Sequence, residues 1–264
     1  MSGRLRATVL GCGASPGVPR IGNDWGVCDP NDRRNRRTRT SLLIERFAVA
    51  GAEATRILVD SGPDVRAQLL AANVGTVDAV VYTHAHADHT HGIDDLRPMR
   101  YGRGGPLPGY GHEETVRRLR NRFGYVFAGQ HGYSTICTIE PLDRLRMCAG
   151  FGVAWCQMEH GPAQTTAYRF DADGKSIGYA TDFSAINREM VQLFDGADIL
   201  VIDCLKREPH PTHAHLAMSL ELAEAARVKT AVLTHMDRSM DYATVSSEVP
   251  GHVLVGYDGL VLEA

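Results

Sequence analysis

The stretch His84-Ala85-His86-Ala87-Asp88-His89 directly follows the apolar run Asp78-Ala79-Val80-Val81-Tyr82-Thr83. Such a run is typical of a buried strand. The histidines are therefore expected on the turn at the carboxyl end of that strand, where an α/β layer usually carries its chemistry. Neutral imidazole is a common metal ligand near pH 7. The first two histidines can hold one ion, and the aspartate and third histidine can reach a second. The alternative is a histidine-rich surface turn.

The composition is that of an ordinary globular protein. The 264 residues are 44% apolar and 22% charged, and the net charge of −3 gives no overall attraction to nucleic acid or membrane. No apolar run approaches the roughly 20 residues that span a bilayer, and residues 1–6 lack the apolar core of a signal peptide. The cysteines have no short-spaced pair, which favours free thiols and a cytoplasmic location. They are Cys12, Cys28, Cys137, Cys148, Cys156 and Cys204.

Periodicity predicts an alternation of strands and helices along the chain. Strands are expected at 4–10, 41–49, 55–60, 78–83, 106–111, 151–159, 165–170, 176–181, 198–204 and 229–234. Helices are expected at 63–72, 112–121, 186–194 and from 210 to 227. Asp171-Ala172-Asp173-Gly174 predicts a hairpin turn. No linker or low-complexity tract interrupts the chain, so residues 1–264 are expected to form a single domain.

The motif H-x-H-x-D-H after a strand resembles the signature of metallo-β-lactamase-fold hydrolases. Four further elements of that pattern follow its order: Asp60 after an apolar run, His160, Asp182 after a strand, and His235 after another strand. The resemblance covers nearly the whole chain. It implies an α/β fold in the form of a four-layer αββα sandwich, and a metal-dependent hydrolase.

The resemblance also implies a ligand set for two metal ions. His84, His86 and His160 hold the first ion, Asp88, His89 and His235 hold the second, and Asp182 bridges both. Asp60 is expected to hydrogen-bond a metal-ligating histidine and fix its tautomer. Nitrogen and oxygen ligands suit Zn²⁺ or Mn²⁺, and the sequence does not choose between them.

Two further motifs are similar to one branch of the family, the phosphoribosyl 1,2-cyclic phosphate phosphodiesterases. They are Gly17-Val18-Pro19 and Arg36-Arg37-Thr38-Arg39-Thr40-Ser41. This branch implies hydrolysis of a small phosphodiester, such as a cyclic ribose phosphate or nucleotide, by a homodimer without membrane contact. Two ions and two carboxylates leave positive charge that suits a phosphodiester and its transition state.

The resemblance places three catalytic residues: Asp88, Asp182 and His213. His213 follows Pro211-Thr212, where members of this branch carry a histidine that contacts the phosphate or protonates the leaving oxygen. A surface histidine, or one that bonds the backbone at a helix start, is the alternative. His215 is the other candidate for this role. Arg39 and Ser41 are possible substrate contacts.

One expected feature of the branch is missing. Members carry a Cys-x-Cys-x-x-Cys cluster and a later histidine for a structural zinc, but here Asn23 and Trp25 replace two cysteines, Cys28 alone remains, and Arg238 stands at the histidine position. One thiolate cannot hold a tetrahedral zinc. We therefore expect no structural zinc, and a loop held by Trp25 and hydrogen bonds.

Several segments allow two interpretations. The glycine-rich stretch 11–19 is either a tight turn or part of the site lining, and the arginines of 33–39 form either a solvated basic face or a phosphate contact. Asp94-Asp95-Leu96-Arg97 is either a feature of the branch or a helix end stopped by Pro98. The aromatic segment 123–133, with Phe127 and Tyr133, is either core or dimer contact, or a substrate lid.

Three rival functions remain open. An RNA-processing nuclease of the same fold would favour a protruding arm and a basic face, and neither RNA-stacking aromatics nor an arm is apparent. A thioesterase or β-lactamase is the second rival, and the β-lactamase would usually carry an export signal. The third is a non-catalytic binding protein, as in pyrroloquinoline-quinone assembly, although such relatives often lose metal ligands. A phosphodiesterase is the favoured interpretation.

Overall fold

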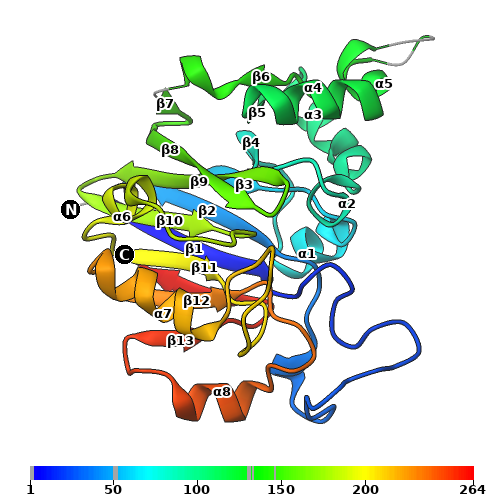
Figure 1. Ribbon diagram of the computed structural model, residues 1–264. Coiled ribbons are helices and arrows are strands. Elements are labelled where there is room, and N and C mark those ends of the chain that lie inside the picture. The colour runs from blue at the N-terminus through cyan, green and yellow to red at the C-terminus, as the bar shows by residue number, and fades with distance from the viewer. Residues whose placement is uncertain (1–2, 50–52, 130–131, 133, 146) are drawn as a thin grey trace.

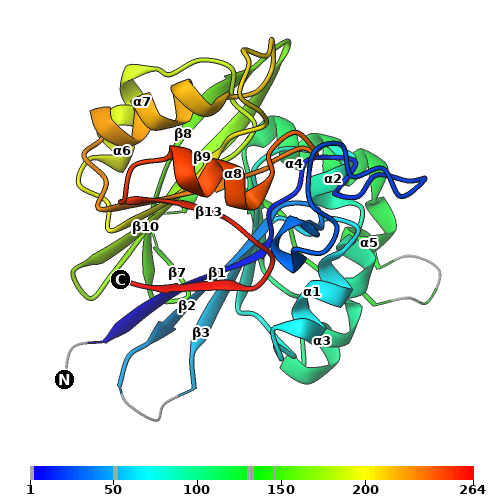
Figure 2. The same cartoon turned by 90° about the horizontal axis from the view of Figure 1, so that it is seen from below.

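The computed structural model describes residues 3–49, 53–129, 132, 134–145 and 147–264 (Figure 1). In this part of the chain, two seven-stranded sheets pack face to face and helices cover their outer faces (Figure 2). This arrangement is the four-layer αββα sandwich that the sequence predicts.

The first sheet is mixed, in the order β14-β1-β2-β3-β4-β5-β6. Its strands are β1 (Arg4–Gly11), β2 (Ser41–Phe47), β3 (Thr55–Val59), β4 (Ala79–Tyr82), β5 (Gly109–Gly111), β6 (Glu140–Pro141) and β14 (Leu260–Glu263). The strands from β3 to β6 run parallel, and β1 pairs antiparallel with both β2 and β14. The carboxyl ends of β3 and β4 therefore meet at one edge.

The second sheet has the order β13-β12-β11-β10-β9-β8-β7. Its strands are β7 (Met147–Cys148), β8 (Phe151–His160), β9 (Ala163–Ala172), β10 (Lys175–Ala180), β11 (Ile199–Asp203), β12 (Thr230–Thr234) and β13 (Val253–Val255). The strands from β10 to β13 run parallel, whereas β8, β9 and β10 form antiparallel hairpins. The predicted hairpin turn at 171–174 joins β9 to β10.

The helices divide between the two outer layers. They are α1 (Val65–Ala71), α2 (Ala87–Thr90), α3 (Arg97–Arg103), α4 (Glu113–Arg122), α5 (Gly124–Ala128), α6 (Arg188–Phe194), α7 (Leu216–Ala225) and α8 (Tyr242–Glu248). Helices α1 to α5 lie on the side of the first sheet, and α6 to α8 lie on the side of the second (Figure 2). Short 3-10 turns occur at Arg33–Asn35, Ile93–Leu96 and Leu142–Arg144.

The main core lies between the sheets. It combines inward-facing side chains of the first sheet, such as Leu42 and Ile44, with Phe151 and Phe170 of the second. A separate apolar cluster lies between the first sheet and its helices. Strands such as β11 are buried at every position, as expected of central parallel strands covered on both faces. This packing fixes the strand ends that carry the site.

One element prediction was wrong in detail, and one of two open alternatives is excluded. Helix α7 begins at Leu216 rather than near His210, because Pro209 and Pro211 hold the preceding segment out of the helix. Pro98 does not stop a helix but occupies the first turn of α3, where its missing N–H costs nothing. Within the described residues, no helix is long and apolar enough to cross a membrane.

Candidate metal centre

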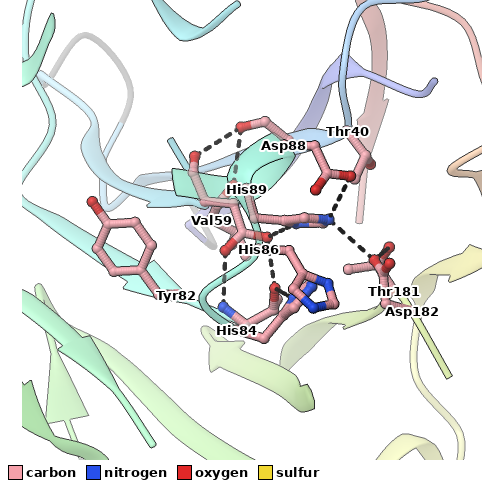
Figure 3. A network of polar contacts seen from close by, with 12 residues as sticks. Thr40, Val59, Tyr82, His84, His86, Asp88, His89, Thr181 and Asp182 are labelled. Carbon is pink, nitrogen blue, oxygen red and sulfur yellow. Dashed lines mark hydrogen bonds and ion pairs between the residues drawn. The ribbon is translucent and has the colours of Figure 1, made fainter. Parts of the chain in front are cut away.

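The predicted site residues lie where strands of both sheets end. The H-x-H-x-D-H stretch follows β4 and opens the short helix α2, while Asp60 follows β3. From the second sheet, His160 is the last residue of β8, and Asp182 and His235 follow β10 and β12. The face-to-face packing of the sheets brings these strand ends to one edge of the molecule. Figure 3 shows five of the side chains there: His84, His86, Asp88, His89 and Asp182.

Three of these residues have unusual backbones. Asp60, Asp182 and His235 have φ angles of 62°, 61° and 57°. The left-handed region is sparsely populated by residues other than glycine, and such backbones concentrate at functional sites. Each lies just beyond a strand end, so the chain turns sharply at the edge where the site residues meet.

The ligand atoms of the predicted residues converge in three overlapping groups. Within each group the atoms lie within 4.8 Å of one another. The groups are His84, His86 and His160; His84, His89 and Asp182; and Asp88, His89 and His235. Asp182 lies between them, with carboxylate oxygens 3.2 Å from His89 Nε2, 3.9 Å from His160 Nε2 and 3.5 Å from His235 Nε2. The buried His/Asp clusters are consistent with a dinuclear metal site.

Unpartnered nitrogen atoms provide the test of whether this cluster suits metal ions. The Nε2 atoms of His84, His89 and His235 are buried and have no hydrogen-bond partner among the described residues. Buried polar atoms are nearly always paired, and an exception needs a physical explanation. Divalent cations would satisfy these nitrogens and the two carboxylates together. The residues present therefore fit a metal centre.

Outer hydrogen bonds turn the Nε2 atoms toward the centre. The Nδ1 atom of His89 lies 2.7 Å from Asp60 Oδ2, as the sequence predicts for a carboxylate that orients a ligating histidine. Asp60 is fully buried and also accepts hydrogen bonds from the Thr83 N–H and hydroxyl, each at 2.8 Å. His160 Nδ1 donates to the Thr212 carbonyl at 2.6 Å.

The electrostatics of the cluster favour cation binding. Burial, followed by the neighbouring His89, holds the pKa of His84 well below its usual value. Burial also lowers the pKa of His86. Although burial alone would raise the pKa of Asp182, the charges of His235 and His89 outweigh it and lower that pKa. His84 and His86 are thus kept neutral beside an anionic Asp182, and these are the protonation states that metal ions require of their ligands.

The opposite shift occurs at two histidines beside the carboxylates. Burial alone would lower the pKa of His235, but Asp182, Asp88 and Asp203 raise it to about 9. Burial also opposes protonation of His89, whose pKa is nevertheless raised by Asp182 and Asp88. A metal ion would have to displace these protons, so metal binding should release protons and strengthen as the pH rises toward 9.

His213 lies beside this cluster, and a carboxylate that the sequence analysis missed lies behind it. The Nδ1 atom of His213 is 3.5 Å from Asp182 Oδ1 and 3.4 Å from Asp203 Oδ2. Its ring stacks on His235 at 4.9 Å. Asp203 is fully buried, and its other oxygen is 3.5 Å from His235 Nδ1. Asp203 ends β11, and its position after an apolar strand was the available sequence signal.

The candidate substrate contacts have different surroundings. Ser41 is buried, and its hydroxyl donates to the Val59 and Asp60 carbonyls, so it supports the strand ends rather than reaching a substrate. Arg39 forms an ion pair with Asp64 at 2.9 Å. His215 occupies the N-cap position of α7 without a side-chain capping hydrogen bond, and its buried Nδ1 has no hydrogen-bond partner among the described residues.

Two of the open segments gain a clearer interpretation. Ser15, from the glycine-rich stretch, donates its hydroxyl to Asp88, so that stretch does line the centre. In the aromatic segment, Phe123 and Phe127 pack against the apolar cluster under the helices, which favours the core interpretation for those residues. Tyr133 lies outside the described residues.

The arginines of 33–39 do not form one uniform basic face. Arg34 pairs with Asp32 and lies over the Tyr242 ring, and Arg36 lies over the Trp25 ring. Arg37 is buried, at 2% exposure. Together with the Arg39–Asp64 pair, these contacts engage four of the five arginines within the protein.

Two cavities border the histidine cluster. One, of about 340 Å³, is lined at the cluster by His213 and His235 and contains Arg20 and Lys206. The other, of about 320 Å³, is lined at the cluster by His84 and His86. Both are within the usual range for small-molecule sites.

The family profile described as "Beta-lactamase superfamily domain" matches residues 55–236, which include every predicted metal ligand. The chain belongs to the beta-lactamase superfamily. Its fold is that of the superfamily, and its buried His/Asp cluster is consistent with a metal site.

Several known proteins are similar to most of this chain. The crystal structure of a diphosphatase from the PhnP family is 34% identical, with a TM-score of 0.87, and the match covers 99% of this chain and 97% of that one. A Porphyromonas gingivalis protein named octanoyltransferase is 32% identical over 262 residues, covering 97% of this chain and 51% of the relative. A ribonuclease Z of Mycobacterium bovis is 26% identical over 252 residues, covering 79% and 87%. The chain spans about half the length of the first curated relatives it matches.

Proposed function

We propose that this superfamily member is a phosphodiesterase that hydrolyses a small phosphodiester. The observation that carries the proposal is the cavity at His213 and His235. It contains two cations, Arg20 and Lys206, and neither forms an ion pair with any described residue. Cations that form no ion pair suit an anionic substrate. The similarity to a PhnP-family diphosphatase supports phosphate chemistry at this centre.

We assign the seven predicted residues to two divalent ions, Zn²⁺ or Mn²⁺. His84, His86 and His160 would hold the first, Asp88, His89 and His235 the second, and Asp182 both. Such ions supply Lewis acidity, which neutralises phosphate charge and makes water a better nucleophile. Asp60 and the Thr212 carbonyl orient two of the imidazoles. The Ser15 hydroxyl orients the Asp88 carboxylate by donating a hydrogen bond to it.

The proposed proton donor to the leaving group is His213. In hydrolysis, a water oxygen bonds to phosphorus while the bond from phosphorus to the leaving oxygen breaks, and that oxygen must gain a proton. His213 Nδ1 faces the carboxylates of Asp182 and Asp203, which leaves Nε2 as the nitrogen to donate this proton. Its position on the cavity wall gives it access to the substrate.

Other members of the superfamily suggest three alternatives. The diphosphatase relative suggests a phosphoanhydride substrate, which would meet the same centre. The ribonuclease Z relative suggests RNA, which we do not favour because most of the 33–39 arginines are engaged within the protein. Acyl transfer through a thiolate is disfavoured because all six cysteines are buried, and burial raises the pKa of Cys204 to about 12.

The test is turnover of bis-p-nitrophenyl phosphate by metal-reconstituted protein, beside cyclic nucleotides, one nucleoside diphosphate and one thioester. Diester turnover that disappears in Asp182→Ala supports the proposal. The matched control is Glu221→Ala, which removes an exposed carboxylate on α7 and should leave turnover unchanged. Turnover of the diphosphate or thioester alone would contradict it. Metal-loaded but inert protein would favour a binding role.

We also propose that the described fold acts as one domain and that two copies form a homodimer. A single cooperative unfolding transition is expected for one domain. Sedimentation equilibrium should give twice the mass of 28.8 kDa. A monomer at micromolar concentration would contradict the dimer.

A further inference from the structure

The two cavities reach the metal centre from different sides. One borders it at His84 and His86, and the other borders it at His213 and His235. They have no lining residue in common, and their volumes are similar, about 320 and 340 Å³. A phosphate held at the centre therefore has room for a substituent on each side.

The cavities differ in charge. The cavity at His213 contains Arg20 and Lys206 against one carboxylate, Asp237, which already accepts hydrogen bonds from the Ser239 N–H and hydroxyl. Among its histidines, His210 adds no charge near neutral pH, because burial and the neighbouring His213 lower its pKa. This cavity, the basic cavity, has a surplus of positive charge before any metal is bound.

The cavity at His84, which we call the neutral cavity, has no such surplus. Its only opposite charges, Glu114 and Arg118, pair with each other at 2.7 Å. Its other polar groups include the amides of Gln157 and Gln164. Gln157 donates to Thr166 and retains its carbonyl oxygen as an acceptor for a ligand. Uncharged hydrogen-bonding groups suit a sugar or nucleoside.

We propose that the substrate is a linear, unsymmetrical phosphodiester, with an anionic substituent in the basic cavity and a neutral polar substituent in the neutral cavity. The inference rests on the proposed phosphodiesterase function. A cyclic diester carries both ester oxygens on one sugar, so it would fill one cavity and leave the other empty. The geometry thus favours a linear substrate over the cyclic one that the sequence resemblance implies.

The position of His213 adds a direction to the cleavage. His213 lines the basic cavity and not the neutral one. If it protonates the leaving oxygen, the anionic substituent departs as an alcohol. The water oxygen then stays on the phosphate, which remains attached to the neutral substituent as a phosphomonoester.

A dinucleotide series tests both substrate shape and direction. The probes are the 5′-phosphorylated deoxydinucleotide pTpA, its dephosphorylated form TpA, and deoxyadenosine 3′,5′-cyclic phosphate. We expect kcat/KM for pTpA to exceed that for TpA about tenfold, the gain from two partly exposed ion pairs. The value of kcat/KM for TpA should exceed that for the cyclic diester by a similar factor, on the order of tenfold, because TpA fills both cavities.

The products of pTpA report the direction directly. Departure of the anionic arm gives thymidine 5′-phosphate and deoxyadenosine 5′-phosphate. Departure of the neutral arm gives thymidine 3′,5′-bisphosphate and deoxyadenosine, and would overturn the assigned direction. Chromatography separates the two outcomes.

Paired variants test each cavity. The double variant Arg20→Ala/Lys206→Ala should bring the ratio of kcat/KM for pTpA to that for TpA close to one. Its control is Arg66→Ala, which removes an exposed charge on α1 and should not change the ratio. Ala163→Trp should fill the neutral cavity and lower TpA turnover more than cyclic turnover. Ala154→Trp, on the exposed face of β8, is its control.

Binding provides a readout that does not depend on turnover. Calorimetry should show thymidine 3′,5′-bisphosphate binding about tenfold more tightly than thymidine 3′-phosphate, with the difference lost in the Arg20/Lys206 double variant. If the protein hydrolyses bis-p-nitrophenyl phosphate but has equal kcat/KM for linear and cyclic diesters, the proposed function stands and the inference of a linear substrate is overturned. If no diester is hydrolysed, the proposed function fails. Equal binding of the two thymidine phosphates would show that the basic cavity does not hold the anionic substituent.

Discussion

Two buried polar regions of this protein differ in how completely their hydrogen bonds are made. In the metal centre, the Nε2 atoms of His84, His89 and His235 have no hydrogen-bond partner among the described residues, although carboxylate oxygens of Asp182 lie 3.2 and 3.5 Å from the last two. In the loop region around Arg37, the guanidinium donates to the Asp237 and Met240 carbonyls at 3.2 and 2.5 Å, and only its Nε lacks a partner. The first region needs cations to become satisfied, whereas the second is stabilised by the chain itself.

The Arg37 region is also where related phosphodiesterases are expected to carry a structural zinc. Here Cys28 lies 3.4 Å from the Arg238 carbonyl, and Arg238 pairs with Asp24 at 3.0 Å. Trp25 donates to Asn23 and stacks with Arg36. Internal contacts thus occupy the positions of the expected ligands. The lack of a third metal site remains a prediction, which the last experiment below tests.

Removing Asp182 should have the largest effect on the metal centre. Its carboxylate contacts ligand atoms from both proposed ion sites, so Asp182→Ala should lower both metal content and kcat. The loss in kcat should exceed the roughly 10²–10⁴-fold cost of removing one general acid. Elemental analysis and bis-p-nitrophenyl phosphate kinetics measure the two effects. Full metal content with normal turnover would contradict the assignment.

His213→Ala should separate chemistry from metal binding. If His213 is the proton donor, kcat should fall by about 10²–10⁴-fold while the metal content stays intact. The loss in kcat should be smaller for p-nitrophenyl esters than for alkyl esters, because the p-nitrophenolate leaving group needs little protonation. Equal deficits on both classes would argue against proton donation. An unchanged kcat would exclude His213 from catalysis.

Asp60→Asn tests orientation of a ligand rather than ligation itself. The variant weakens the charge-assisted bond to His89 Nδ1, so metal affinity should fall by about 10–100-fold. Competition with a chelator of known affinity measures the change. Asp195→Asn, at an exposed position beyond α6, is the control. Equal metal affinities in the two variants would show that the hydrogen bond between Asp60 and His89 does not affect metal binding.

The sequence predicted the fold and the cluster because their signals are local. The motif at 84–89 and the strand-end positions of Asp60, Asp182 and His235 follow from runs of neighbouring residues. The supporting contacts were missed because they join distant segments: Ser15 reaches Asp88 across 73 positions, and His160 reaches Thr212 across 52. Periodicity carries no information about such pairs.

The same limit applies to Ser41. Its place in a family-like motif indicated a substrate contact, but the pairing of β2 with β3 directs its hydroxyl to the Val59 and Asp60 carbonyls. Asp203 was read only as part of a strand, although β11 ends beside β10 and β12 and so places this carboxylate behind both His213 and His235. Strand order, which the sequence did not predict, decides both positions.

Arg37→Met should have the smallest effect on the metal centre while lowering stability. The variant keeps the aliphatic volume but leaves the Asp237 and Met240 carbonyls without their charged donor, so the free energy of unfolding should fall by about 1–3 kcal/mol. Urea unfolding measures this change. Wild type and variant should each retain two ions per chain, because no metal depends on this region. Three tightly held zinc ions in the wild type, with one lost in Arg37→Met, would show that the loop region binds metal after all.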